Sequence, residues 1–367
     1  MDPKARLLPA LAARPAALAG RTCLVGFDGF VDTIVTPVAR RSGPGEDFAA
    51  FGGIAEFGRQ VLAAAGKSTN FELYPRMEKP GGNGPIMAGA LAAIGAGVTC
   101  VGTLGRPGLH PVFAGLAARA RLVSLAEPAR TSALEFPDGK VMLGIMRSLD
   151  EVTPAALAAA FGEPGYRETV GAADLVVLGN WTMLPHMTEI YRDLTGRLLP
   201  ALPDRPDRIF FFDLADPEKR APGDLAAALE AIAQFSRFGR AILGLNLKEA
   251  QQVLTALALG SEPETPEGFR SAATKIRARL DLDTVVVHPK ESAACATRAG
   301  AWWLAGRYTP TPLLSTGGGD HFNAGFAAAQ LLGLDPESSL LLGVSTSGHY
   351  VRTGHSPSTS DLLSFLA

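Results

Sequence analysis

The stretch LSTGGGDHFNAGFAAAQ, residues 314–330, places three consecutive glycines directly before a pattern of helical period. Glycine lets the backbone approach an anion closely, and a helix N-terminus offers unpaired N–H groups and the positive end of the helix dipole. The sequence therefore predicts a phosphate-binding glycine turn at Gly317, Gly318 and Gly319. Asp320 begins the helix, where it would stay ionised and could take a proton from an attacking hydroxyl. The alternative is a tight turn in which Asp320 merely caps the helix.

Outward from this stretch, short apolar runs alternate with longer Ala/Leu-rich stretches of helical period. The runs are residues 22–26, 97–102, 175–179, 208–213, 241–245 and 284–288, and the helical stretches are residues 85–94, 154–161, 187–198, 224–235, 247–258 and 268–280. Apolar strands of about five residues, each followed by a helix, predict an α/β fold with a doubly wound, mostly parallel sheet and helices on both faces. Ligands of such sheets bind at the carboxyl ends of the strands.

Two segments break this alternation. Residues 31–38 continue the first strand, and residues 131–146 have the pattern of a hairpin that turns at Asp138-Gly139. Without a helix between them, these segments predict a small β lid that folds over the site. Residues 40–80 form an insertion in which we expect one helix at 49–65. We interpret the whole chain, residues 1–367, as a single α/β domain with this lid.

Composition narrows the function classes. The chain has 367 residues, a formal net charge of −2 and 47% hydrophobic residues, which predicts a large core and no basic surface for nucleic acid or an anionic membrane. Three cysteines, Cys23, Cys100 and Cys295, show no CxxC spacing, so neither a disulfide framework nor a zinc site is expected. Pro9, Arg14 and Pro15 interrupt any signal peptide, and no apolar run of about 18 residues predicts a membrane span. We expect a cytoplasmic protein.

Two further stretches carry polar residues at helix starts. GGNGPIMAGALAAIGAGVTCVG, residues 81–102, is a glycine-rich turn, a helix and a strand, in which Asn83 points at a ligand hydroxyl or serves the turn. LGLNLKEA, residues 243–250, ends a strand at Asn246 and carries Glu249 on the first helical turn. Side chains three residues apart share one face of a helix, so this pair could organise Mg²⁺ through its waters. The local alternative is a capping box.

Taken in order, the three stretches resemble those of the ribokinase-like (PfkB-type) carbohydrate kinases, over nearly the whole chain. The resemblance implies a ribokinase-like fold and transfer of the terminal phosphate of ATP to a hydroxyl of a sugar or sugar-like molecule. It gives Asp320 the role of general base and the backbone of Gly317–Asp320 that of an anion hole. It also implies that Asn246 and Glu249 act with Mg²⁺ and the nucleotide, Glu249 through water.

The residues that the resemblance assigns to binding the sugar, which accepts the phosphate, lie in the early part of the chain. GFDGFVD, residues 26–32, is similar to the first strand of these kinases, which supplies an acidic ligand for a sugar hydroxyl; Asp28 and Asp32 both remain candidates. The GGN turn implies that Gly82 and Asn83 also bind the substrate. Lids in this family often pair two copies, so the resemblance makes a homodimer plausible.

The sequence departs from the family pattern at several positions. Ser315 stands where an Asp associated with a monovalent cation is common, so the resemblance does not extend to potassium activation. Ile86 replaces an Asn of the first signature, and residues 285–294 lack the family's Thr-x-Gly-x-x-Gly turn near the nucleotide. These departures indicate a divergent subgroup with its own substrate.

Three other functions are alternatives to a sugar kinase. A nucleoside kinase of the same fold would need aromatic cover for a base, and the low aromatic content of 7% favours a sugar instead. A non-catalytic sugar or nucleotide sensor would have no need of Asp320. A dinucleotide oxidoreductase is disfavoured because the first turn after a strand, GFDGFV at residues 26–31, lacks the G-x-G-x-x-G pattern.

Overall fold

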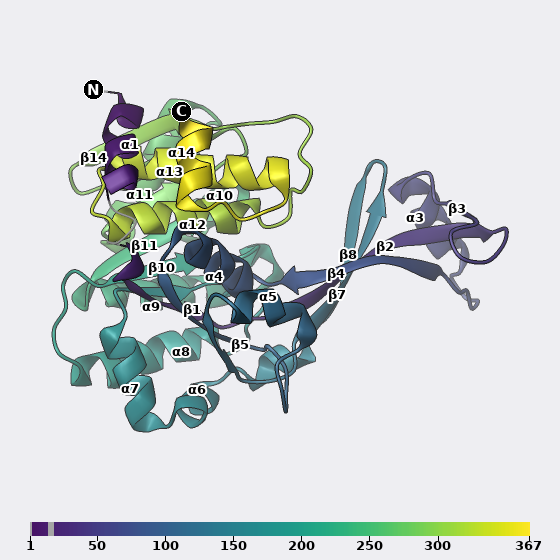
Figure 1. The fold of residues 1–367 in the computed structure, drawn as a ribbon, viewed down its shortest axis with the longest axis horizontal. Helices are drawn as coiled ribbons and strands as arrows, with labels where there is room; N and C mark the ends of the chain where they lie inside the picture. The colour runs from purple at the N-terminus through teal and green to yellow at the C-terminus, as the bar shows by residue number, and fades with distance from the viewer. Residues whose placement is uncertain (1, 14–17) are drawn as a thin grey trace.

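The computed structural model describes residues 2–13 and 18–367, so Arg14 and Pro15 lie outside the described residues. Within that part of the chain, nine strands form one twisted sheet in the order β14-β13-β12-β11-β10-β9-β1-β5-β6 (Figure 1). The strands from β6 to β12 are parallel, whereas β13 and β14 run antiparallel at one edge. Their bounds are β1 Thr22–Gly26, β5 Gly97–Gly102, β6 Arg121–Ser124, β9 Leu175–Leu178, β10 Ile209–Asp213, β11 Arg240–Leu245, β12 Thr284–Val287, β13 Ser292–Thr297 and β14 Gly300–Ala305.

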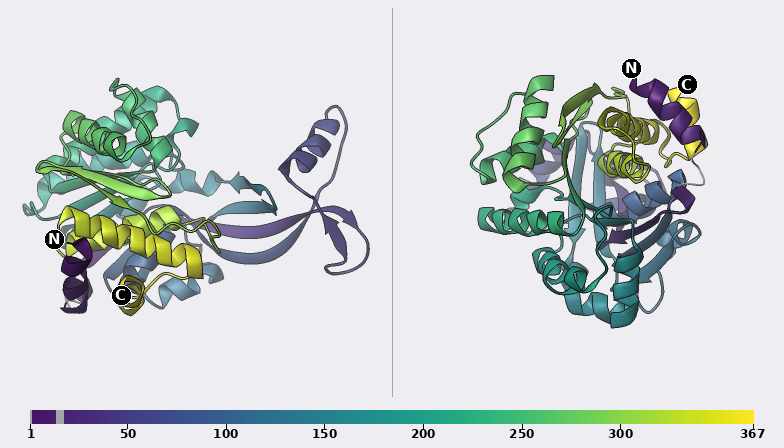
Figure 2. Two further views of the ribbon diagram at one scale, coloured as in Figure 1. Left: turned by 90° about the horizontal axis from the view of Figure 1, so that it is seen from above. Right: turned by 90° about the vertical axis from the view of Figure 1, so that its left-hand side faces the viewer.

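Helices cover both faces of this sheet (Figure 2). One face carries α1 Pro3–Ala13, α4 Asn83–Ile94, α12 Gly318–Leu331, α13 Pro336–Thr353 and α14 Thr359–Leu366. The other carries α6 Pro154–Phe161, α7 Glu163–Ala172, α8 Met187–Asp193, α9 Pro222–Ala233, α10 Leu247–Ala256 and α11 Pro266–Leu280. Successive side chains of β10 point to opposite faces of the sheet, so this strand contributes to the hydrophobic core on each face. Phe210 and Phe212 pack on one side, and Ile209 and Phe211 pack on the other. The predicted doubly wound fold is confirmed.

The order of the strands fixes where a ligand can bind. β1 lies between β5 and β9, so the chain first builds the sheet toward β6 and then returns to build it in the opposite direction. Crevices of doubly wound sheets open at such a switch point, at the carboxyl ends of the strands. Polar side chains follow the strands at this edge, namely Asp28 after β1, Asn180 after β9, Asp213 at the end of β10, Asn246 after β11 and His288 after β12.

A second sheet extends away from the main body (Figures 1 and 2). Its strands are β2 Phe30–Arg41, β3 Phe48–Ala50, β4 Glu72–Gly81, β7 Ala129–Phe136 and β8 Gly139–Ile145. β2 pairs with β7, β3 and β4, and β7 pairs with β8. The segments that the sequence suggested as a lid, 31–38 and 131–146, contribute to β2, β7 and β8 of this sheet.

The insertion at residues 40–80 differs from the expectation. The predicted helix at 49–65 is wrong at its start, because β3 ends at Ala50 and α3 spans only Ile54–Ala63. Gly52 and Gly53 separate the two elements, and Gly53 is extended, with φ 173° and ψ 171°. The helix packs on the second sheet around a small core of its own, formed by Val35, Phe51, Leu134 and Phe136 with Ile54, Phe57, Phe71 and Leu73 at its margin.

None of the helices in the described part of the chain is long and apolar enough to cross a membrane.

Candidate active site

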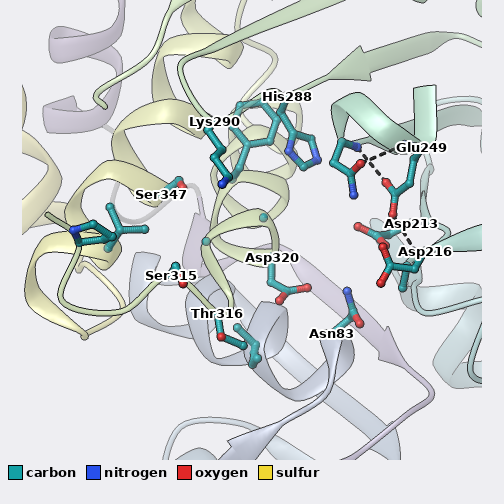
Figure 3. Close-up of a pocket in the computed structure, with 18 of the residues that line it drawn as sticks. Asn83, Asp213, Asp216, Glu249, His288, Lys290, Ser315, Thr316, Asp320 and Ser347 are labelled. Atoms are coloured by element: carbon teal, nitrogen blue, oxygen red, sulfur yellow. Dashed lines mark hydrogen bonds between the residues drawn. The ribbon is translucent and has the colours of Figure 1, made fainter. Parts of the chain in front are cut away.

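A cavity of about 800 Å³ opens at the carboxyl ends of the central strands, between them and the base of the second sheet. From the second sheet it is lined by Phe30, Asp32, Thr131, Met142 and Gly144, and from the opposite side by His288, Lys290, Tyr308, Ser347 and Val351. Asp320 and the start of α12 lie between these two groups, where the Asp320 carboxyl points into the open space (Figure 3). A ligand could therefore reach Asp320 from either side.

The predicted glycine turn is present at the start of α12. Gly317 is the N-cap residue with φ +92°, a left-handed conformation that side chains strongly disfavour. The N–H of Gly318 donates to the Ser315 carbonyl at 3.2 Å, whereas the N–H groups of Gly317 and Gly319 have no hydrogen-bond partner in the described part of the chain. The N-cap position of α12 is occupied by Gly317, so Asp320 stands within the first turn of the helix and not at its cap position. The turn thus leaves amide donors at the cavity.

Asp320 is surrounded by other acids. Removal from bulk water raises the pKa of its carboxyl well above the ordinary value, and the charges of Asp213 and Asp28 raise it further. A hydrogen bond from the side chain of Asn83 acts in the opposite direction and lowers this pKa. The expectation that the helix dipole alone keeps Asp320 ionised is therefore incomplete. A carboxyl with a raised pKa is, however, a stronger base once it is deprotonated.

The two candidate acids of the first strand have different surroundings. Asp28 is fully buried and absent from the cavity wall; its carboxylate accepts hydrogen bonds from the N–H of Asn83 at 2.9 Å, the N–H of Gly84 at 2.8 Å and the side-chain amide of Asn180 at 2.6 Å. It thereby satisfies the first amides of α4. Asp32 lines the cavity instead.

The carboxyl of Asp32 is held among polar groups of the second sheet. Burial raises its pKa, whereas the charge of Lys79 and a hydrogen bond from Thr131 lower it. Lys79 stands directly opposite Asp32 in the β2–β4 pairing. Gly81 explains how β4 comes so near, because a Cβ atom there would lie 2.4 Å from the Asp32 carboxylate.

Two amide side chains complete this part of the wall. Asn83, the first residue of α4, lines the cavity together with Gly82, and its amide points toward Asp320 (Figure 3). Asn180, which the sequence did not single out, also lines the cavity; its backbone is left-handed, with φ 54°. Its Oδ1 atom is buried with no hydrogen-bond partner in the described part of the chain. A hydroxyl of a ligand could satisfy this oxygen after a small rearrangement.

Asn246 and Glu249 form the capping box that was the local alternative. The Asn246 side chain accepts from the Glu249 N–H at 3.0 Å, and Glu249 accepts from the Asn246 N–H at 2.8 Å and from the Asp216 N–H at 3.0 Å (Figure 3). Both residues still line the cavity. Capping and ligand binding are compatible here, because each carboxylate oxygen keeps a further lone pair.

A second acid, Asp213, lies beside this pair. Asp213 accepts a 2.7 Å hydrogen bond from the side chain of Asn323, and its pKa is raised by burial and by the charge of Glu249. Burial also raises the pKa of Glu249 itself. No group of three or more His, Cys, Asp or Glu side chains among the described residues is arranged to hold a metal ion directly. Among the described residues, the charges that act on the carboxyl groups of Asp213 and Glu249 are those of other acids.

The profile of the family described as prokaryotic ketohexokinase matches residues 4–367. The chain is also 30% identical over 353 residues to the ketohexokinase of Haloferax volcanii, an alignment that covers 96% of this chain and 92% of that protein.

The chain belongs to the prokaryotic ketohexokinase family.

Solved structures agree on the fold of this family member. The Arabidopsis thaliana ribokinase complexed with ribose and ATP matches with a TM-score of 0.65 at 18% identity, covering 94% of this chain and 98% of that one. A carbohydrate kinase from Agrobacterium tumefaciens gives 0.64 at 20% identity, covering 94% and 97%. The Methanocaldococcus jannaschii nucleoside kinase gives 0.61 at 13% identity, covering 94% and 98%, so the fold alone does not separate sugar from nucleoside kinases.

Membership of the prokaryotic ketohexokinase family distinguishes a sugar kinase from a nucleoside kinase. The protein is a sugar kinase, a phosphotransferase with an alcohol group as acceptor, and its substrates are a sugar and a nucleotide. The predicted resemblance to ribokinase-like carbohydrate kinases is confirmed, and the sensor and oxidoreductase alternatives are not supported.

Proposed function

We propose that this protein transfers the terminal phosphate of ATP to a hydroxyl of a ketohexose, with Asp320 as the general base. The single observation that carries the proposal is the position of Asp320, whose carboxyl faces the cavity between the second sheet and the nucleotide side, directly after a glycine turn. The name of the Haloferax volcanii relative supports a ketohexose as the acceptor.

The acceptor would bind on the side of the second sheet. Asp32 and Asn83 offer an acceptor and a donor for sugar hydroxyls, and the backbone of Gly82 lines the same wall. Asn180 adds an oxygen without a partner in the described part of the chain. Buried polar groups of this kind select for a substrate that pairs with them, because leaving them unpaired costs binding energy.

Asp320 would take the proton of the attacking hydroxyl. Its raised pKa, caused first by burial and then by Asp213, moves the base toward the operating pH. The free N–H groups of Gly317 and Gly319 support an anion hole for charge that develops on the transferring phosphoryl group. Asp28, in this proposal, fixes the start of α4 rather than the sugar.

The acids around Asp213 and Glu249 fit a magnesium ion that accompanies the nucleotide. Magnesium usually keeps several of its waters and is held by one or two carboxylates and by substrate phosphates, so the lack of a direct cage is no obstacle. Burial and then the charge of Glu249 raise the pKa of Asp213, and a cation placed between these two acids would stabilise their ionised forms. When bound, magnesium would neutralise charge on the phosphates. Asp213 and Glu249 would orient its waters.

The second sheet is proposed to close the site as a lid. Lys140 of β8 donates a hydrogen bond to the Thr316 side chain, which joins this sheet to the residue before the glycine turn. A lid closed in this way would exclude water from the phosphoryl group. The outer edge of β8 exposes 51% of Leu143 and 71% of Ile145. An exposed apolar edge strand supports pairing with a second copy, hence a homodimer.

A coupled assay of ADP release tests the proposal. Ketohexoses, aldohexoses, pentoses and nucleosides would be offered separately with ATP and Mg²⁺, and the phosphorylated product identified by NMR. We expect the highest kcat/KM with a ketohexose. Preferential turnover of a nucleoside would contradict the acceptor, and the absence of ADP release with every acceptor would contradict catalysis itself.

A further inference from the structure

The rear of the glycine turn is held by two aromatic side chains that do not line the cavity. The hydroxyl of Tyr350, on α13, donates to the carbonyl of Thr316 at 2.9 Å. The Nδ1 atom of His321, on α12, lies 2.7 Å from the carbonyl of Gly317. The two rings stack with a centroid separation of 3.6 Å and an interplanar angle of 11°. His321 is 1% exposed and Tyr350 7% exposed.

The hydrogen bonds fix the protonation of His321. A carbonyl oxygen only accepts, so Nδ1 must carry the ring proton that it donates to Gly317. Nε2 then accepts from the hydroxyl of Ser356, 2.9 Å away. Burial lowers the pKa of His321 to about 4, so the ring is neutral and keeps this tautomer around neutral pH. Burial likewise raises the pKa of Tyr350 to about 12, so its hydroxyl remains a donor.

These contacts act on two successive peptide units of the glycine turn, one of which carries the Gly317 N–H of the proposed anion hole. In a planar trans peptide the C=O and the following N–H point in opposite directions. The Thr316 carbonyl and the Gly317 N–H belong to one such unit, and the Gly317 carbonyl and the Gly318 N–H belong to the next. Holding the Thr316 carbonyl from behind therefore sets the direction of the Gly317 N–H. The Gly317 carbonyl, which also accepts from the His321 N–H at 3.0 Å, is held so that the Gly318 N–H stays on the Ser315 carbonyl and keeps the turn closed.

We propose that His321 and Tyr350 are positioning residues that hold the shape of the glycine turn, so that the N–H of Gly317 is aimed at the transferred phosphoryl group. The inference rests on the proposed function and adds a part to it. Packing alone would not require the polar atoms, because Phe at either position would fill the same space. The turn needs external support, since Gly317 has φ +92° and its N–H has no partner in the described part of the chain.

The direction of an N–H matters most in the transition state. Charge develops there on the phosphoryl oxygens, and removing one such donor typically lowers kcat by about 10²–10³-fold, whereas a misdirected donor should cost less. Sugar and nucleotide binding in the ground state would change little. The inference therefore predicts a fall in kcat with little change in KM.

Four variants test it. Tyr350→Phe removes one oxygen and His321→Phe removes both ring nitrogens, while both keep the stacked pair. His321→Asn restores a donor near the Nδ1 position. His349→Phe is the matched control, because His349 is adjacent to Tyr350 on α13 but contacts Thr353 and Phe365 instead of the turn. Steady-state kinetics with the best ketohexose, and thermal unfolding of each variant, are measured.

We expect kcat to fall about tenfold in Tyr350→Phe and His321→Phe, with both KM values within about twofold of wild type. His321→Asn should recover most of the loss, and His349→Phe should match wild type. Full kcat in folded Tyr350→Phe, or His321→Asn as impaired as His321→Phe, would overturn the inference and leave the kinase assignment intact. A wild-type chain without kinase activity on any acceptor would overturn both together.

Discussion

The side-chain amide of Asn180 donates a 2.6 Å hydrogen bond to the carboxylate of Asp28, which joins the loops that follow the neighbouring strands β9 and β1. The same carboxylate accepts the first N–H groups of α4. Asp28 therefore holds three chain segments together at the switch point of the sheet. Asp32, four residues later, faces the cavity instead.

This difference predicts opposite consequences for two similar substitutions. Asp28→Asn should lower the free energy of unfolding by about 1–3 kcal/mol, because an amide cannot accept all the hydrogen bonds that the buried carboxylate accepts. Asp32→Asn should raise the KM for the sugar with a smaller loss of stability. Urea unfolding and sugar saturation curves measure the two effects. A stable Asp28→Asn variant with a raised sugar KM would reverse the assignment.

The pH dependence of catalysis should report the acids around Asp320. Its pKa is raised by burial and then by the charges of Asp213 and Asp28, so kcat/KM should fall on the acid side above the ordinary pKa of a carboxyl group. Asp213→Asn removes one of these charges and should move the acid limb to lower pH. Asp216→Asn is the control and should leave the position of the limb unchanged. If the acid limb of kcat/KM stayed at the same pH in Asp213→Asn, the proposed effect of the Asp213 charge on the pKa of Asp320 would be wrong.

The same acids predict how stability depends on pH and magnesium. Burial raises the pKa of Asp213 and Asp320 in the folded protein, so between their ordinary and raised pKa values the folded state binds more protons than the unfolded chain. The contribution of these two acids to the free energy of unfolding should therefore be fully present below the ordinary carboxyl pKa and be lost as the pH rises through this window. Mg²⁺ should offset part of this loss. Urea unfolding of wild type and of Asp213→Asn across this pH range, with EDTA or with MgCl₂, measures both effects, and an unchanged pH dependence of stability in Asp213→Asn would contradict the argument.

Association through β8 can be tested at its exposed edge. Ile145→Lys places a charge on a side chain that is 71% exposed, so it should leave the fold intact and disrupt a paired edge. Light scattering coupled to gel filtration should show a dimer for wild type and a monomer for Ile145→Lys. Leu109→Lys, at an exposed apolar residue in the loop after β5, is the control and should remain dimeric. A monomeric wild type would rule out the proposed homodimer.

The parallel sheet was predictable because its strands are continuous apolar runs. β9 and β10 are buried along their whole length, which short runs of Val, Leu, Ile and Phe indicate directly. β4 gave no such signal, since most of its residues are exposed or half-buried and Pro75 and Pro80 interrupt it. Its pairing with β2 is a long-range contact that local pattern does not encode.

The part of the candidate site that lies within one short segment could be predicted from the sequence. The glycine turn and Asp320 are adjacent in sequence, so their arrangement follows from local structure. The choice between Asp28 and Asp32 depends on contacts with Asn180 and with β4, which lie far away in the chain. The sequence offered one indication of Asn180, namely its place directly after a predicted strand. His321 and Tyr350 are in contact only because α12 packs on α13, which the sequence does not show.

The central claim is that Asp320 is the base, and the variant Asp320→Asn tests it most directly. Its kcat for the best ketohexose should fall by about 10²–10⁴-fold, because the amide cannot accept the proton of the attacking hydroxyl. The affinity for ATP, measured by calorimetry, should remain close to that of wild type. Near-normal turnover of any phosphorylated sugar product by a folded Asp320→Asn protein would contradict the account.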